Sequence, residues 1–328
     1  ARTRPAAAHF HRLRRRGSLP PLPGVPFLIG TLGAVIRLRS RPRSNHENFD
    51  IGLAGPLAGF VVAILILFYA FLSLPPQDYV FQFHPEYEQY GADYAEHVYE
   101  REYVRAITGT DQPVVTGVKL GSNLVFLFFE TFVADPDRVP NENEIMHYPV
   151  LVACYIALFV TCLNLLPIGQ LDGGHVIYGL FGFKKHRVIA TVFFVALIFY
   201  AGLGLPYIRL DFNEYIFGLP GLVITIPVYL YFLYLCMKGL RMPMRDTVMY
   251  ALLMFAAHFL LTNFFPEING YQGWLLFAFI LGRMVGVQHP PSEIEEPLDS
   301  QRIVLGWLTL LIFILCFSPV PFTVNVVE

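Results

Sequence analysis

Charged residues are scarce in this sequence. They make up 15% of its 328 residues, whereas 55% are hydrophobic and the mean hydropathy is +0.51. Soluble globular domains carry about 25% charged residues. The shortage excludes a disordered chain, a water-soluble enzyme of ordinary composition and a nucleic-acid partner. The composition predicts an all-α fold, a polytopic transmembrane helical bundle in a lipid bilayer.

Cysteine is also rare, and its placement argues against disulfides and metal fingers. The four cysteines all lie inside apolar runs, outside the polar loops and without metal-finger spacing. They are Cys154, Cys162, Cys236 and Cys316. Free cysteines of this kind are usually buried, so we expect four buried thiols.

Acidic residues are absent from residues 1–45, which hold ten arginines. The positive-inside rule places this segment in the cytosol. The loop 75–146 has 13 acidic and four basic residues, which fits the opposite side of the membrane. Basic residues return at 184–187 and at 238–245, as expected where the chain comes back to the cytosol.

Several apolar runs are long enough to cross a bilayer as helices, for which roughly 20 residues are needed. Gly273–Gly286 is short and contains Arg283, so we expect about 6–7 spans. The runs are Ile51–Leu74, Tyr148–Pro167, Val188–Leu205, Phe217–Met237, Thr247–Phe265, Gly273–Gly286 and Ile303–Pro319. In the first of these, Gly55 and Gly59 are four residues apart, a spacing that favours close helix packing.

One polar motif follows the second long span. It reads Asn164-Leu-Leu-Pro-Ile-Gly-Gln-Leu-Asp-Gly-Gly-His175. A carboxylate beside an apolar helix is costly without a partner or a metal ion, and proline and glycine here interrupt helical structure. Two interpretations remain open on this evidence. Asp172 faces a polar cavity as a ligand, or it caps the helix that follows.

This motif resembles the Asn-Pro…Leu-Asp-Gly motif of the site-2 protease family of intramembrane zinc metalloproteases. Phe49-Asp-Ile-Gly-Leu-Ala-Gly-Pro-Leu-Ala-Gly-Phe60 is similar to the start of that family's core helix after the zinc-binding helix, and Gly30–Arg39 is similar to the segment between the two. The resemblance covers roughly residues 24–322.

The resemblance implies a zinc site built from an HExxH helix and one distant aspartate, with the HExxH glutamate as general base. By the motif match Asp172 is the third zinc ligand, Asn164 contacts the substrate or the developing oxyanion, and Pro167 and Gly173 shape the helix break. The sequence contains no HExxH, so no catalytic residue is identifiable. We expect zinc for the intact family site, and no tight zinc binding by the chain as given.

Two histidines are alternative ligands. His175 lies three residues after Asp172, and His258 lies inside an expected span. For both, a hydrogen-bonded structural role competes with metal binding.

The resemblance divides the chain into four parts. Residues 1–23 are a basic segment resembling a disordered tail or a transit sequence. Residues 24–50 are a re-entrant or interfacial segment that includes the short apolar run Phe27–Leu38. Residues 51–182 hold the protease core spans and the extramembrane loop 75–146, and residues 183–328 add C-terminal spans.

The predicted function is that of a multi-pass zinc metalloendopeptidase of a bacterial inner membrane or a plastid-like membrane, with membrane proteins as substrates. One alternative is a truncated or inactive family member that binds membrane proteins without cleaving them. Another is a transporter, for which a carboxylate at a broken helix is equally natural, although the sequence shows no internal repeat.

Overall fold

The computed structural model describes residues 42–327, except 110–113, 211–214 and 217–218. The predictions for residues 1–23 and for Phe27–Leu38 concern residues outside this set. The helix expected to begin at Ile51 begins at Asn45, where the Ser44 hydroxyl accepts a hydrogen bond from the Glu47 N–H.

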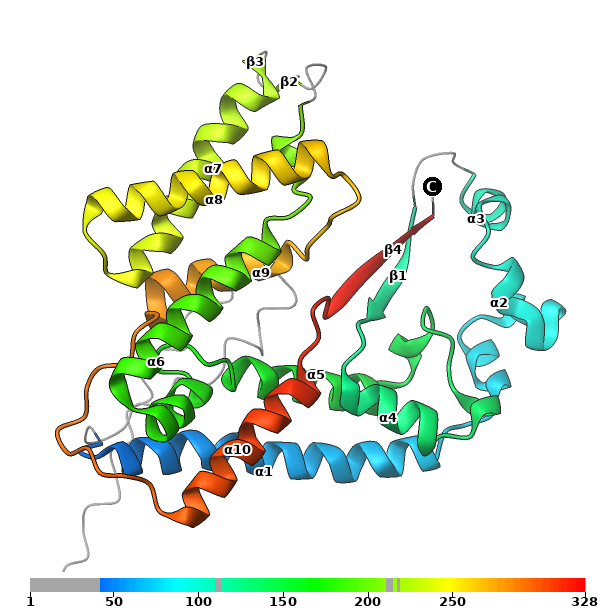
Figure 1. Cartoon of the computed structure of the whole chain (residues 1–328). Coiled ribbons are helices and arrows are strands. Elements are labelled where there is room, and N and C mark those ends of the chain that lie inside the picture. The colour runs from blue at the N-terminus through cyan, green and yellow to red at the C-terminus, as the bar shows by residue number, and fades with distance from the viewer. Residues whose placement is uncertain (1–41, 110–113, 211–214, 217–218, 328) are drawn as a thin grey trace, which may run out of the picture. The chain divides into compact units, whose positions relative to one another are not determined.

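Helices dominate the described residues, as the composition predicts (Figure 1). The α-helices are α1 (Asn45–Leu72), α2 (Tyr94–His97), α3 (Arg101–Thr108), α4 (Leu124–Phe132), α5 (Pro149–Asn164), α6 (Asp172–Ala201), α7 (Gly221–Met237), α8 (Met244–Phe264), α9 (Gly273–Ile280) and α10 (Ser300–Cys316). Short 3₁₀ helices are η1 (Gln77–Gln82), η2 (Pro85–Asp93), η3 (Pro136–Arg138), η4 (Ile145–His147), η5 (Pro206–Ile208) and η6 (Lys238–Leu240), and η7 (Leu281–Val285) is a π-helical turn.

Three described helices are long and apolar enough to cross a membrane: α1, the run Gly221–Leu240, and α8. Shorter apolar helices are α5, α10 and the run Gly273–Val285. The 30 residues of α6 are interrupted at Gly182, where φ is +73°. The helical membrane bundle is therefore confirmed, while the number of spans stays a prediction.

One face of α1 is apolar and exposed in the described part of the chain. Val61 and Val62 are each 55% exposed and Leu65 is 64% exposed, in the middle of a helix without charges over this stretch. Burying apolar surface away from water is worth roughly 25 cal/mol per Å². Lipid contact at this face recovers that free energy, which is the behaviour of a spanning helix.

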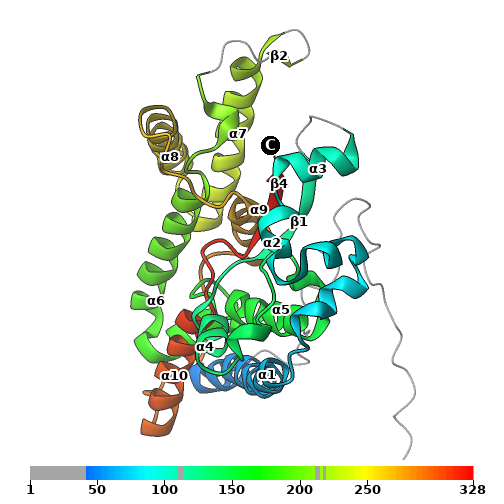
Figure 2. The same ribbon diagram turned by 90° about the vertical axis from the view of Figure 1, so that its right-hand side faces the viewer.

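Two hydrophobic clusters form the interior. The first joins α1, α5 and α4 through residues such as Leu67, Phe126 and Tyr155. The second joins α6, α7, α8 and α9 through residues such as Phe194 and Leu233. Helices α7 and α8 lie side by side (Figures 1 and 2).

The loop 75–146 is more than a solvated cap. Its short helix α4 packs into the first cluster, where the Phe126 ring meets the Phe71 ring of α1 at 5.2 Å between centroids. The stretch Tyr87–Arg105 is helical only in pieces, which include α2 and the start of α3.

Strand pairing ties this loop to the C-terminal end of the described chain. Strand β1 (Val114–Leu120) runs antiparallel to β4 (Phe322–Val327), with Leu120 opposite Phe322 (Figure 1). A second small pair, β2 (Tyr215–Ile216) with β3 (Leu219–Pro220), precedes α7. Sequence reasoning predicted neither pair.

Gly55 and Gly59 make no close helix contact within the described residues. There, nothing lies within 4 Å of a Cβ built on Gly55, and only the Thr161 hydroxyl, at 3.9 Å, approaches one built on Gly59. The close approach occurs at Gly52 instead, where a Cβ would stand 2.8 Å from the Asp172 carbonyl oxygen. Glycine is required at position 52 because α1 packs closely against the start of α6 there.

All four cysteines are free and buried, as predicted.

Candidate active site

The chain breaks its helix immediately after Asn164, the last residue of α5. The Ile168 N–H donates to the Leu166 carbonyl at 2.7 Å, which makes a tight turn around the buried Pro167. Gly169 then adopts φ +57° and donates its N–H to the Val287 carbonyl at 2.9 Å. A Cβ at this position would lie 2.0 Å from the Gly286 oxygen, so only glycine fits the turn.

Asp172 opens the next helix. The N-cap of α6 is Leu171, which offers no side-chain cap, and Asp172 stands in the first turn. The interpretation of Asp172 as a helix cap is therefore not supported. Within the described residues its carboxylate makes no hydrogen bond and no ion pair, although it is partly buried.

Burial raises the pKa of Asp172, which lies between two expected spans, to about 6. An acid in the first turn interacts favourably with the helix dipole, by about 0.3–1 kcal/mol. This is too little to offset the desolvation of a carboxylate, so the ionised form calls for a cation.

Backbone packing holds Asp172 in place. On one side Gly52 of α1 approaches its carbonyl oxygen, and on the other Gly173 packs on the turn. A Cβ on Gly173 would meet the Leu165 carbonyl oxygen at 1.9 Å. These two glycines bring α1, the end of α5 and the start of α6 together at the backbone of Asp172.

His175 is hydrogen-bonded to another histidine. Its Nδ1 lies 2.8 Å from Nε2 of His289, and Nδ1 of His289 donates to the Pro290 carbonyl. Because a neutral imidazole carries one proton, His289 accepts at Nε2. His175 therefore donates from Nδ1 and keeps its lone pair on Nε2. Burial first, and the neighbouring histidines next, lower the pKa of His175 to about 4, which keeps the ring neutral.

A segment between α9 and α10 braces this region. Tyr178 of α6 stacks on the His289 ring at 4.3 Å and accepts a hydrogen bond from the Ser292 N–H. Asn45, at the start of α1, exchanges two hydrogen bonds with the backbone of Glu296. Residues that follow His289 thus tie α6 to α1 beside Asp172.

His186 is a buried residue that sequence reasoning missed. It is fully buried, and neither ring nitrogen has a partner among the described residues. Its ring lies 5.7 Å from that of His289. In the sequence, His186 follows two lysines and precedes an apolar run. A surface histidine can have the same neighbours, so the sequence does not indicate that His186 is buried.

His258 has a structural role. Its Nε2 donates to the Phe199 carbonyl at 3.0 Å and its Nδ1 accepts from the Tyr229 hydroxyl at 2.9 Å. Both nitrogens are occupied, so the hydrogen-bonded interpretation is the one that the structure supports.

Zinc needs more ligands than the described residues place at Asp172. A zinc site uses three or four protein ligands, and here the described residues offer the Asp172 carboxylate and the lone pair of His175. Asn164 is exposed at the end of α5, with no side-chain hydrogen bond in the described part of the chain. The described residues alone therefore do not complete a zinc centre, and no catalytic step is derived through one.

A family model described as peptidase family M50 matches residues 25–205. The chain is 25% identical over 173 residues to "Probable zinc metalloprotease EGY2, chloroplastic" of Arabidopsis thaliana, covering 49% of this chain and 24% of that protein. It is 25% identical over 157 residues to "Probable zinc metalloprotease EGY1, chloroplastic" of Oryza sativa subsp. japonica, covering 48% and 22%. The chain thus spans about a quarter of the length of these relatives. No solved structure matches the chain significantly.

Proposed function

The chain belongs to peptidase family M50, the site-2 protease family, and we propose that it carries the aspartate part of an intramembrane zinc endopeptidase that cleaves membrane-embedded proteins. The relatives it resembles are named zinc metalloproteases. The observation that carries the proposal is Asp172, a partly buried carboxylate without a partner among the described residues, at a break between two apolar helices.

Asp172 supplies one anionic oxygen ligand for zinc in this proposal, and the other protein ligands come from an HExxH helix. Bound zinc would lower the pKa of a water molecule toward neutrality and polarise the scissile carbonyl. The chain's own contribution is to hold the carboxylate at a fixed place, through Gly52 and Gly173, and to keep its surroundings poor in water.

The neighbouring motif residues orient the substrate. Asn164 is exposed at the last residue of α5, where the helix breaks, so its amide is free to hydrogen-bond an extended peptide or an oxyanion. Pro167 removes one N–H from the turn and Gly173 allows α6 to start against Leu165. A cleavable peptide must be unwound, because hydrolysis requires access to a carbonyl that a helix hydrogen-bonds.

The membrane setting is multi-pass in this proposal, with membrane proteins as substrates. The exposed apolar face of α1 supports lipid contact, and the long apolar helices support several crossings. The chloroplastic relatives favour a plastid-like membrane over a bacterial inner membrane.

The function is tested with a full-length natural protein that carries this sequence together with an HExxH helix. We expect the purified protein to cleave a single-span membrane protein in a zinc-dependent reaction. Binding of the substrate without any cleavage, in a protein whose natural sequence lacks HExxH, would establish the non-cleaving alternative.

The sidedness of loop 75–146 is a separate prediction. A Gln89→Cys variant should react with an impermeant maleimide only from the side opposite the cytosol, since the acidic loop and the Arg-rich segment lie across the membrane from each other. Gln89 is exposed and the four natural cysteines are buried, so background labelling is low.

Lys185→Cys is the matched control, because Lys185 is exposed in the basic stretch expected in the cytosol. Sealed vesicles of known orientation should label the two positions from opposite sides. Labelling of both from one side would overturn the topology.

A further inference from the structure

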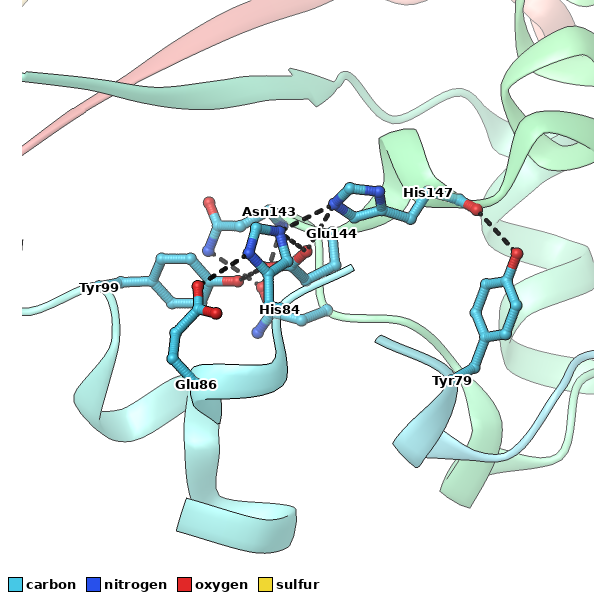
Figure 3. A network of polar contacts seen from close by, with 8 residues as sticks. Tyr79, His84, Glu86, Tyr99, Asn143, Glu144 and His147 are labelled. Atoms are coloured by element: carbon cyan, nitrogen blue, oxygen red, sulfur yellow. Dashed lines mark hydrogen bonds and ion pairs between the residues drawn. The ribbon is translucent and has the colours of Figure 1, made fainter. Parts of the chain in front are cut away.

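Three metal-ligating side chains converge far from Asp172. They are His84, just before η2, Glu144, at the start of η4, and His147, at the end of η4. Figure 3 shows the two rings and the carboxylate pointing toward one another. In the part of the chain that the structure describes, this is the only group of three such residues whose ligand atoms lie within 4.8 Å of one another.

We propose that His84, Glu144 and His147 form a zinc site that fastens loop 75–146 to the beginning of α5. The donor set is two imidazoles and one carboxylate, which suits zinc. This site is separate from the one at Asp172 and does not depend on the proposed protease activity. The proposal replaces the expectation from the sequence that the chain as given binds no zinc tightly, which considered only the family site.

The distances match a tetrahedral site. Nε2 of His84 and Nε2 of His147 are 3.1 Å apart, and Oε2 of Glu144 lies 3.7 Å and 3.3 Å from them. Zinc bonds of about 2.0–2.1 Å in a tetrahedron put neighbouring ligand atoms about 3.3–3.4 Å apart. The three observed separations scatter around this value, and a fourth position stays available for water.

The proton positions also favour a cation. Nδ1 of His84 lies 3.3 Å from the Glu86 carboxylate, which only accepts hydrogen bonds. Nδ1 therefore carries the proton, and the lone pair of neutral His84 is on Nε2, toward Glu144 and His147. A histidine that donates its other N–H to a carboxylate is the usual support of a metal ligand.

Packing holds the three ligands in position. The His84 ring stacks on Tyr87 at 4.5 Å, and the His147 ring stacks on Phe83 at 4.4 Å. The Glu144 side chain is only 4% exposed, and its Oε1 accepts a hydrogen bond from the Tyr99 hydroxyl.

The site lies at the other end of α1 from Asp172. Gly52 packs on Asp172 near the start of α1, and His84 follows the far end of the helix at Leu72. Twenty residues of α-helix span about 30 Å. A zinc ion here therefore serves the loop. It crosslinks two segments 60 residues apart in the sequence, which limits the conformations open to the loop.

Metal binding to the purified 328-residue chain in detergent tests the proposal. Metal is first removed with a chelator, and Zn²⁺ or Co²⁺ is then added and the excess removed. We expect one bound Zn²⁺ per chain by elemental analysis, or one bound Co²⁺ with the intense visible bands of a tetrahedral complex. His84→Gln and His147→Gln should each weaken zinc binding at least 100-fold.

Two variants serve as controls. His97→Gln changes an exposed histidine of the same loop that stacks only on Tyr90, and Asp172→Asn changes the family position. Both should bind zinc as the wild type does. Loss of binding in Asp172→Asn alone would place the metal at the other site and overturn the proposal.

Limited proteolysis tests whether bound zinc fastens loop 75–146 to the beginning of α5. Zinc should protect the wild-type loop from trypsin at the exposed Arg101, and should not protect His84→Gln. If the wild-type chain binds no metal at micromolar Zn²⁺, the proposal is overturned. The close approach of His84 and His147 would then be explained by a hydrogen bond between their imidazoles. That result is readable even where a variant fails to fold, and it would leave the protease proposal unaffected.

Discussion

Asp172→Asn, in the natural protein with its HExxH helix, is expected to lower the rate of substrate cleavage at least about 100-fold while the protein accumulates normally. Asparagine keeps the shape of the side chain and loses its charge, so zinc would be held less tightly and its water activated less. Zinc contributes several kcal/mol of transition-state stabilisation, and each 1.4 kcal/mol is a factor of ten in rate.

Stability should change little in this variant. The Asp172 carboxylate has no hydrogen bond or ion pair to lose within the described residues, and removing a charge from a partly buried place relieves desolvation. The favourable interaction with the dipole of α6 accounts for at most about 1 kcal/mol.

Asp246→Asn is the matched control, because Asp246 also stands in the first turn of an apolar helix. The assay compares cleavage of a co-expressed membrane protein at equal expression of each variant. Near-normal cleavage by Asp172→Asn would show that Asp172 is not a zinc ligand. Its role would then be that of an acidic residue in the first turn of a helix, as for Asp246.

Gly173→Ala is expected to destabilise the protein by more than about 3 kcal/mol, the upper range for overpacking a core. The new Cβ would lie 1.9 Å from the carbonyl oxygen and 2.3 Å from the carbonyl carbon of Leu165. Both atoms belong to the backbone, so no side chain can rotate to make room. Relief requires that the turn and the start of α6 move apart, which would also displace Asp172.

Gly55→Ala is the control for this substitution. It lies in α1 with nothing within 4 Å of its Cβ, and alanine is favoured over glycine in a helix by about 1 kcal/mol. Thermal unfolding in detergent should show a lower Tm for Gly173→Ala and an unchanged or higher Tm for Gly55→Ala. Equal Tm values for Gly173→Ala and the wild type would contradict the packing of α6 on the turn.

Local features of the site follow from the sequence because they depend on neighbours in the chain. Pro167 and Gly169 disfavour helical structure, and they lie between the end of α5 and the start of α6. The apolar runs likewise mark the helices, since a bilayer requires a continuous stretch of about 20 apolar residues. Boundaries moved by a few residues, as at Asn45, where a capping serine extends α1.

The contacts between helices could not be predicted from the sequence. The glycine pair at Gly55 and Gly59 matched a packing motif, yet the close contact is made by Gly52, because the orientation of α1 is decided by α6 and α5 together. A motif describes one helix face, and whether a neighbour covers that face depends on the rest of the fold.

The sequence by itself determined the membrane class, the positions of the apolar helices and the motif that contains Asp172, because composition, apolar run length and local order are all carried by neighbouring residues. Only the tertiary structure decided that His175 meets His289, that β1 pairs with β4, and that His84 meets Glu144 and His147. His175 and His289 are 114 residues apart, and His84 and His147 are 63 residues apart. These meetings depend on how distant segments pack against one another, which local sequence order does not encode.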